Sequence, residues 1–337
     1  MLAGASVSLF VLMILLAYLS PFAYMLTTAF KDRTMMSNSN APLWPATEAT
    51  YTYEGKEYPV YKVPTDDGEI HSWALYKKGR EKSLFIDPKN PAVAPIEWEG
   101  RWRTLEQDWI FSPQWGNFSQ AWEELRMPLL LRNTLVIAIL GSIGTLISCT
   151  IVAYGFSRFR IPGKNILFTI LIATIILPGF VTMVPTYALF AKIGWIGTWL
   201  PLIVPHFFAN AYNVFLLRQF FMGIPRELDE AAMIDGASPL RTLWSVILPQ
   251  SMPVLVAVGL FHLIWAWNDY LGPLIYLSAK RDLQPISIGI QSYNALYSFQ
   301  PHMVQAASLL GLLLPVILFF MAQKLFMRGV VFTGVEK

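Results

Sequence analysis

The sequence predicts an all-α polytopic membrane protein with six transmembrane helices and a small β-rich insertion outside the membrane. Hydrophobic residues make up 55% of the 337 residues, charged residues only 14%, and the mean hydropathy is +0.46. This balance does not suit a water-soluble surface. The net charge of +3 is too near neutral for a chain whose main partner is nucleic acid, and the single cysteine, Cys149, excludes an internal disulfide and structural zinc.

Apolar stretches of about 20 residues with at most one charged residue, enough for a helix to cross ~30 Å of hydrocarbon, occur six times. They cover residues 6–30, 134–156, 166–190, 199–217, 254–277 and 306–321. The first stretch exceeds the ~7–15-residue apolar core of a signal peptide, so we expect residues 1–30 to remain as a transmembrane helix. The other five helices are expected to form a transmembrane core over residues 131–328.

Basic residues in the short loops predict the orientation, because lysine and arginine are enriched on the cytoplasmic side. One side holds nine of them: Arg158, Arg160, Lys164, Arg218, Arg226, Arg241, Lys324, Arg328 and Lys337. The short loops on the other side hold three, which are Lys192, Lys280 and Arg281. The sequence therefore predicts an integral protein of the cytoplasmic (inner) membrane of a prokaryote, with both termini in the cytoplasm.

Residues 31–130 differ sharply in composition from the apolar stretches and are expected to form an extracytoplasmic loop. They carry 12 of the 25 basic and 15 of the 22 acidic residues. Runs of tyrosine and valine separated by turn residues predict a β-rich insertion at about residues 48–110. Seven of the twelve tryptophans lie in this loop, where they either form the core of the insertion or stack on a sugar or dock a partner.

Residues 224–249 predict a hairpin of two short helices that meet at a glycine. Pro225 suits the first turn of a helix, three acidic residues follow near its positive end, and Gly236 supplies a left-handed stop. Ser238 then caps a second helix that is expected to end at Pro249. The predicted apolar face of that second helix consists of Leu240, Leu243, Trp244 and Ile247. The alternative is an amphipathic loop that lies on the bilayer surface.

The same hairpin carries a motif at fixed spacing. Glu230-Ala231-Ala232 is followed after three residues by Gly236, and then after nine by Val246, one further residue and Leu248-Pro249. In this pattern the chain resembles the permease subunits of binding-protein-dependent ABC importers, in the carbohydrate branch. It is most similar there to the second (G-type) membrane subunit of maltose-type systems, although that family has isoleucine in place of Val246. The similarity covers about residues 1–45 and 113–337, so the insertion departs from the family.

The resemblance implies a heterodimeric pore formed with a second, paralogous permease subunit and surrounded by membrane lipid. Two ATP-binding subunits would bind ATP and magnesium, and an extracytoplasmic solute-binding protein would deliver a sugar or oligosaccharide. The cytoplasmic hairpin would couple to the ATPase. The residues implied in that coupling are Glu230, Ala231, Ala232, Asp235, Gly236 and Arg241. The cytoplasmic tail, residues 329–337, would also reach toward the ATP-binding subunits.

The chain itself lacks the residues of a nucleotide-hydrolysing site. A phosphate-binding loop needs a glycine five residues before Gly-Lys and a hydroxyl residue directly after it. Around Gly163-Lys164 these two positions hold Arg158 and Asn165. The four histidines show no metal-ligand spacing, and no Gly-x-Ser-x-Gly segment occurs. We therefore expect a non-enzymatic subunit that binds no cofactor or metal.

Polar side chains within two apolar stretches are candidates for contact with a substrate, because polar groups in a membrane usually face a cavity or another helix. At helical spacing they are His206, Asn210 and Asn213 in one stretch and His262, Trp265, Asn268 and Asp269 in the other. An aromatic ring beside amide and carboxylate groups suits a polyhydroxylated ligand. The alternative is that these groups hydrogen-bond one helix to another.

Two other classes of protein remain as alternatives. An ion-coupled secondary solute carrier would show inverted repeats and buried titratable relays. The apolar stretches contain one acidic residue, Asp269, and no duplicated half. A membrane receptor that uses the β-rich insertion as a sensor would need a cytoplasmic output domain, and the sequence predicts none.

Overall fold

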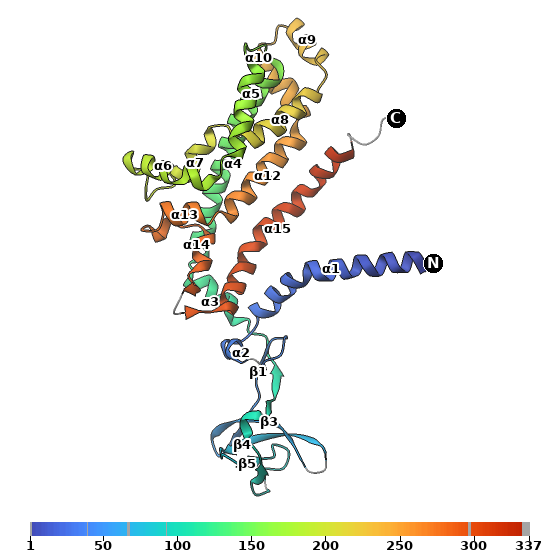
Figure 1. Cartoon of the computed structure of the whole chain (residues 1–337), viewed down its shortest axis with the longest axis vertical. Helices are drawn as coiled ribbons and strands as arrows, with labels where there is room; N and C mark the ends of the chain where they lie inside the picture. The colour runs from blue at the N-terminus through green and yellow to red at the C-terminus, as the bar shows by residue number, and fades with distance from the viewer. Residues whose placement is uncertain (1, 39, 66–67, 92, 296–297, 332–337) are drawn as a thin grey trace. The chain divides into compact units, whose positions relative to one another are not determined.

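The computed structural model describes residues 2–38, 40–65, 68–91, 93–295 and 298–331. These residues fall into two compact units (Figure 1). The first unit comprises the chain up to Trp122 together with residues 293–310, and the second comprises residues 123–292 together with the chain from Gly311 onward. The long helix α15 (Pro301–Val331) belongs to both units.

In the first unit, α1 (Leu2–Ala29) is followed by the short helix α2 (Arg33–Ser37) and leads to the β-strands. The Asn117 side chain of α3 (Gly116–Glu124) donates hydrogen bonds to the carbonyls of Ala29 (2.9 Å) and Lys31 (3.0 Å). The Lys31 ammonium donates to the Pro42 carbonyl at 3.0 Å, and burial lowers its pKa. The end of α1 is thereby fixed to the segments on both sides of the strands.

The strands form antiparallel sheets, which confirms the predicted β-rich insertion. The larger sheet has the order β2-β3-β4-β5-β6, with β7 also paired to β3. Its strands are β2 (Thr50–Tyr53), β3 (Lys56–Pro64), β4 (Ile70–Lys77), β5 (Lys82–Ile86), β6 (Ile96–Glu99) and β7 (Glu106–Gln107), and the 3₁₀ helix η1 (Trp102–Thr104) precedes β7. A separate pair joins β1 (Ala46–Glu48) to β8 (Trp109–Phe111). A second small pair, β9 (Asn294–Ala295) and β10 (Ser298–Phe299), precedes α15.

Both faces of the larger sheet are covered by side chains, because successive residues of a strand point to opposite sides. One face buries Val60 of β3, Ala74 of β4 and Ile86 of β5 beneath four half-buried tyrosines. The other face buries Trp73 and Phe85, the latter with no exposed surface. Three tryptophans of the loop are substantially exposed instead: Trp44 (56%), Trp115 (69%) and Trp122 (43%). The tryptophans therefore supply only part of the core.

The second unit is helical. Its longer helices are α4 (Met127–Arg158), α5 (Lys164–Ala173), α6 (Gly179–Lys192), α8 (Ala211–Gly223), α9 (Glu227–Ile234) and α12 (Met252–Asn268). Its shorter ones are η2 (Thr174–Ile176), α7 (Leu200–Ile203), η3 (Val204–Phe207), α10 (Pro239–Thr242), η4 (Leu243–Ile247), α11 (Leu248–Gln250), α13 (Leu271–Tyr276), η5 (Arg281–Leu283) and α14 (Ile286–Gln291). The core joins α4, α8, η4 and α12 through buried side chains such as Val214, Phe221, Ile247 and Val258.

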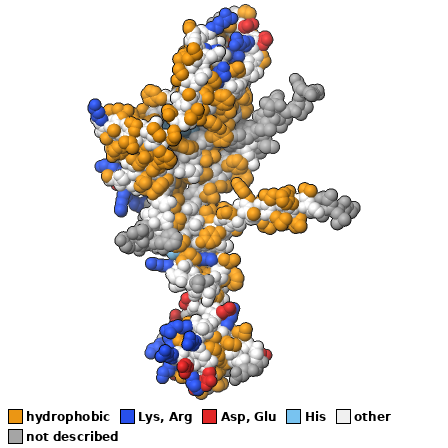
Figure 2. Space-filling model, in the orientation of Figure 1, with side chains coloured by type: hydrophobic (Ala, Val, Ile, Leu, Met, Phe, Trp, Pro, Cys, Tyr) orange, Lys and Arg blue, Asp and Glu red, His pale blue; other side chains and the backbone are white. Residues whose placement is uncertain are grey.

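Four helical segments in the described part of the chain are long and apolar enough to cross a membrane, and up to six if each of two bent pairs counts as one span. The four are Ser6–Ala29, Met127–Arg158, Leu200–Gly223 and Pro301–Met321. Figure 2 shows apolar side chains over the helices of the second unit, with charged side chains gathered over the larger sheet and at the α9–α10 end.

Besides the stretch 199–217, which is interrupted between η3 and Asn210, two stretches that were expected to be single helices are broken. The stretch 166–190 consists of two helical segments that meet at 96°, because Pro178 lacks an amide hydrogen and leaves Leu177 extended. The stretch 254–277 is interrupted at Asp269, whose backbone is extended and whose carboxylate accepts a hydrogen bond from the Gly272 amide at 3.1 Å. A count of apolar residues does not detect either break.

Candidate functional site

The hairpin of residues 224–249 folds largely as its turn residues predict. Helix α9 has three acidic residues in its first turn, and Gly236 ends it with a φ of +76°. The Ala237 amide donates back to the Ala232 carbonyl at 2.9 Å, which closes the turn. Ser238 caps α10 by accepting a hydrogen bond from the Arg241 amide at 3.4 Å. Two short helices therefore meet at a left-handed glycine.

The boundaries and the apolar face of the second helix differ from the prediction. The helix does not end at Pro249 but runs through α11 to Gln250, and an 83° bend then leads into α12. The turn Leu243–Ile247 is a π-helix, whose wider turn rotates the side chains away from ordinary helical spacing. Leu240, in α10 before this turn, and Trp244 within it are 72% and 75% exposed. Only Leu243 and Ile247 of the four predicted residues are buried.

The candidate coupling residues are almost all on the surface of the hairpin. Ala232 packs inward with 9% of its surface exposed. The exposed ones are Glu230, Ala231, Asp235, Gly236 and Arg241. Apolar side chains of α9 are exposed beside them, namely Leu228 (39%), Met233 (60%) and Ile234 (86%). We call these three apolar side chains, together with Glu230, the hairpin surface.

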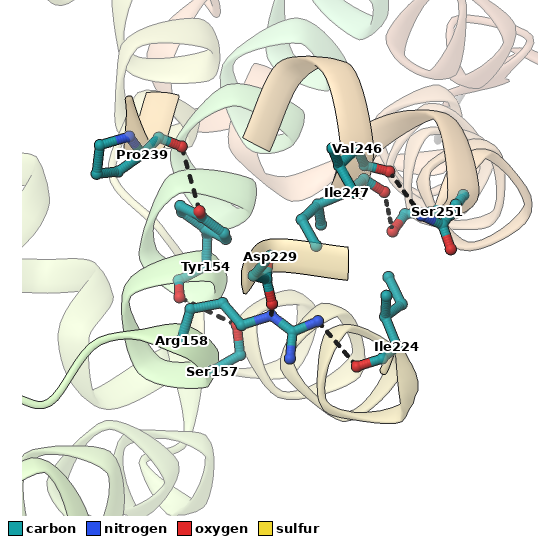
Figure 3. Close-up of polar contacts among 10 residues, drawn as sticks. Tyr154, Ser157, Arg158, Ile224, Asp229, Pro239, Val246, Ile247 and Ser251 are labelled. Atoms are coloured by element: carbon teal, nitrogen blue, oxygen red, sulfur yellow. Dashed lines mark hydrogen bonds and ion pairs between the residues drawn. The ribbon is translucent and has the colours of Figure 1, made fainter. Parts of the chain in front are cut away.

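The hairpin is held to the last turn of α4 by polar contacts that the sequence analysis did not identify (Figure 3). The Arg158 guanidinium, whose side chain is 7% exposed, donates from Nη2 to the Ile224 carbonyl at 2.9 Å. Its Nε lies 3.0 Å from Asp229 Oδ2, at ion-pair distance though without the angle of a hydrogen bond. The Tyr154 hydroxyl donates to the Pro239 carbonyl at 3.1 Å. We call Tyr154, Arg158 and Asp229 the clamp.

The carboxylate of Asp229 is 14% exposed. Burial raises its pKa, and the neighbouring positive charges of Arg158 and Arg226 oppose that rise. The contacts of Arg158 and Tyr154 reach residues 66 and 85 positions later in the chain. No local pattern marks partners so far apart, although an arginine at the very end of an apolar stretch is a signal that it needs a partner.

The candidate substrate residues meet at two cavities within the second unit. A cavity of about 530 Å³ is lined by His206, Asn210, Asn213, His262 and Trp265, with Tyr212 and Phe261. A neighbouring cavity of about 450 Å³ shares His206 and Trp265 and adds Asp269. The His206 ring lies 4.4 Å from the His262 ring and 5.3 Å from the Trp265 ring, measured between centroids. Six of the seven predicted residues therefore line one cavity or both.

The seventh residue, Asn268, does not join them. It is exposed, and its amide donates to the Ile264 carbonyl one turn earlier in its own helix at 2.8 Å. His206, Asn210 and Asn213 were expected to share a face of one helix. That expectation was wrong, because the chain is not helical between η3 and Asn210. Asn210 and Asn213 meet as an N-cap contact, in which the Asn213 amide donates to Asn210 Oδ1 at 3.0 Å.

A strip of small residues on α4 holds the two histidines. Thr145 Oγ1 and His262 Nδ1 share a hydrogen bond at 3.1 Å, and the Ser148 hydroxyl donates to the His206 carbonyl at 3.1 Å. A Cβ atom at Gly141 would lie 2.6 Å from His262 Nε2, so only glycine leaves room for the imidazole. Gly141, Thr145 and Ser148 carry no distinguishing signal in the sequence, because each is unremarkable in an apolar stretch.

The residues that the structure describes include no group of three or more His, Cys, Asp and Glu side chains placed to hold a metal ion.

Comparison with known proteins places this geometry in a family. Residues 144–331, more than half of the chain, match the family described as the binding-protein-dependent transport system inner membrane component. The osmoprotective compounds uptake permease protein GgtD of Synechocystis sp. is 28% identical over 271 residues, which cover 78% of this chain and 88% of the relative. The sn-glycerol-3-phosphate transport system permease protein UgpE of Pectobacterium atrosepticum is 35% identical over 225 residues, covering 64% and 79%.

The fold is also similar to that of a solved structure. A chain from the crystal structure of a bacterial ABC transporter involved in the import of the acidic polysaccharide alginate matches with a TM-score of 0.66. The match covers 96% of this chain and 95% of that chain at 17% sequence identity.

The apolar helices, the polar side chains at two cavities and the folded hairpin are accordingly those of a membrane transport subunit. The chain belongs to the family of binding-protein-dependent transport system inner membrane components, and it is the permease subunit of an ABC importer. This membership favours the importer over the ion-coupled carrier and the receptor.

Proposed function

We propose that this permease imports a sugar or oligosaccharide and that its hairpin docks on a separate ATP-binding subunit. In this proposal it pairs with a second, paralogous permease to form the pore, and it crosses the inner membrane six times with both termini in the cytoplasm. Two ATP-binding subunits carry ATP and magnesium, and an extracytoplasmic binding protein delivers the solute. Residues 332–337 of the tail, which we expected to reach toward those subunits, lie outside the described residues.

The proposal that the hairpin docks on an ATP-binding subunit rests on the hairpin surface. Met233 and Ile234 are 60% and 86% exposed on a helix whose first turn is acidic, and the acidic side chain of Glu230 lies beside them. Exposed apolar side chains beside a charge are typical of a surface that a partner protein covers. The left-handed turn at Gly236 does not pack against the membrane core, because a Cβ atom there would touch nothing within 4 Å.

The two cavities support a hydroxylated, uncharged solute. Trp265 offers an aromatic face, while Asn210, Asn213 and the histidines offer hydrogen bonds to hydroxyl groups. Among the described residues that line either cavity there is no lysine or arginine, and one carboxylate, that of Asp269, is present. Such a lining suits a neutral sugar better than a phosphorylated one.

Crosslinking tests the docking. In the complex purified from membranes with its companion subunits, a cysteine at Ile234, which is 86% exposed, should crosslink to the ATP-binding subunit. Leu43→Cys, at a site 80% exposed on the opposite side of the membrane in this proposal, is the control and should not crosslink to it. Native Cys149 is buried and will not compete. Absence of any crosslink from residue 234 in the assembled complex would contradict the proposal.

Transport assays test the solute. Proteoliposomes that hold the complete transporter should take up a neutral disaccharide, but not its phosphate ester, when ATP and the binding protein are supplied. Trp265→Ala should lower uptake by roughly tenfold, as expected for loss of a stacking contact of about 1–1.5 kcal/mol. Trp265→Phe should restore most of it because a ring remains. Uptake driven by a proton or sodium gradient without ATP would instead support the ion-coupled carrier.

A further inference from the structure

The clamp connects the hairpin to a helix that is not its neighbour in the sequence. The hairpin is joined covalently to α8 and α12. Arg158 of α4 nevertheless binds the Ile224 carbonyl before α9 and the Asp229 carboxylate within α9, and Tyr154 binds the Pro239 carbonyl at the start of α10 (Figure 3). The last turn of α4 therefore touches the hairpin at three separate points.

The covalent junctions are poorly suited to transmit a movement. Ile224 has an extended backbone (φ −78°, ψ 129°) between α8 and α9. At the other junction an 83° bend separates the segment Pro239–Gln250 from α12. Few-residue breaks at helix ends are the places where a chain absorbs rotation as a hinge.

The clamp is a firmer connection. The side chains of Arg158 and Asp229 are 7% and 14% exposed, so water does not compete strongly for their charges, and loss of one partner leaves the other charge buried without compensation. Leu243 and Ile247 of the hairpin also pack in the buried cluster that holds Ala153 and Tyr154 of α4, together with residues of α8 and α12. The hairpin and the end of α4 should therefore move as one body.

The other part of α4 touches the cavity. Thr145 bonds His262 and Ser148 bonds the carbonyl of His206, and both histidines line the cavity of about 530 Å³. Helix α4 is continuous from Met127 to Arg158, and its one proline, Pro128, lies in the first turn. Thr145 and Arg158 are thirteen residues apart in that helix, or about 20 Å along its axis at ~1.5 Å per residue.

We infer that α4 carries the movement of the hairpin to the two histidines at the cavity, with Arg158 as the positioning residue that fastens the hairpin to it. This inference rests on the proposed docking of the hairpin on an ATP-binding subunit. When that subunit moves the hairpin, α4 shifts with it, and the strip of Gly141, Thr145 and Ser148 shifts His206 and His262 relative to the cavity. The solute path thus responds to nucleotide through a non-covalent link.

The test reads the cavity directly. Tyr212 lines the cavity and is 59% exposed, so a cysteine there reports access to a thiol reagent in the complete transporter, with and without ATP plus vanadate. We expect the nucleotide-dependent change in labelling rate to fall about tenfold in Arg158→Met, a size typical of coupling between sites. Tyr154→Phe removes a single hydroxyl and should lower the change more mildly. Arg160→Met removes a charge from an exposed site two residues later and is the matched control that should keep the native response.

The opposite end of the helix provides a second measurement. Gly141→Ala places a methyl group 2.6 Å from His262 Nε2, whereas Gly259→Ala, its control, meets its nearest neighbour at an ordinary 3.4 Å. If Arg158 and Gly141 act through the same helix, the double variant should lose little more of the response than the worse single variant. Additive losses would mean that the two sites act independently and would overturn the inference.

The crosslink from Ile234→Cys separates this inference from the proposed function. If the crosslink forms and the labelling response is lost in Arg158→Met and reduced in Tyr154→Phe, the inference is supported. If the crosslink forms and both variants keep the full response, α4 is not the link and the inference fails while the docking stands. If the Ile234→Cys protein with an intact clamp gives no crosslink, the proposed docking itself fails. Should Arg158→Met not assemble, Tyr154→Phe decides the question.

Discussion

Replacement of Gly236 by alanine tests how much the angle of the hairpin matters. Gly236 has a φ of +76°, and an added Cβ atom would meet nothing within 4 Å, so the substitution brings backbone strain without a clash. A left-handed conformation costs an alanine roughly 1–2 kcal/mol. A change of that size lowers the population of the native turn by about 5–30-fold relative to alternatives. We therefore expect Gly236→Ala to hydrolyse ATP while it transports fewer solute molecules per ATP.

The assay is the ratio of solute taken up to ATP hydrolysed in proteoliposomes that hold the complete transporter. Gly194→Ala is a matched control, because Gly194 also has a φ of +76° and open space at its Cβ but lies in the loop after α6. It should carry the same strain and keep the native ratio. The ratio for Gly236→Asn should lie between those of Gly236→Ala and Gly194→Ala, since asparagine tolerates a left-handed conformation better than alanine does. A native ratio in Gly236→Ala would refute the argument that the turn sets the transmitted angle.

Two further predictions concern the larger sheet. Phe85 is fully buried, so Phe85→Ala should destabilise the sheet by about 3–5 kcal/mol and expose residues 46–111 to limited proteolysis, whereas Phe111→Ala, at a site 67% exposed, should not. The Lys82 ammonium lies 2.7 Å from the Glu99 carboxylate and lowers its pKa, so this pair stabilises the sheet above the ordinary pKa of a glutamate and the effect is lost as the pH falls through the lowered value. Hydrogen exchange of the β5–β6 peptides should therefore be faster in Glu99→Gln than in native protein near neutral pH. This difference should disappear in acid. A difference that persists in acid would contradict a stabilising role of the Lys82–Glu99 ion pair.

Features set by neighbouring residues were predictable from the sequence. Gly236 and Ser238 define the turn and the cap of the hairpin by their own conformational and hydrogen-bonding preferences, and the structure has both. Charged and strand-forming residues likewise located the insertion, because the alternation of side chains along a strand is a local feature of the sequence. The helix break at Pro178 could also have been predicted, since proline followed by glycine is a local signal for a turn. A count of apolar residues does not include that signal.

Features set by distant residues were not predictable. The ion pair of Arg158 with Asp229 joins two helices whose packing only the fold determines. The grouping of His206 with His262 depends on the space that Gly141 leaves on a third helix. The π-turn at Leu243–Ile247 has no residue that demands it, so the apolar face of the second hairpin helix was predicted half wrongly.

The pairing of β1 with β8 has a practical consequence for the engineering of this chain. Ala46 lies opposite Phe111, and the Ser112 amide donates to the Pro45 carbonyl at 3.2 Å. The segment thus leaves and rejoins the rest of the polypeptide about one strand spacing apart, ~4.8 Å. A short bridge can therefore replace the segment without stretching either flank. Excision with a two- or three-residue bridge is accordingly the simplest way to learn what the segment does for the importer.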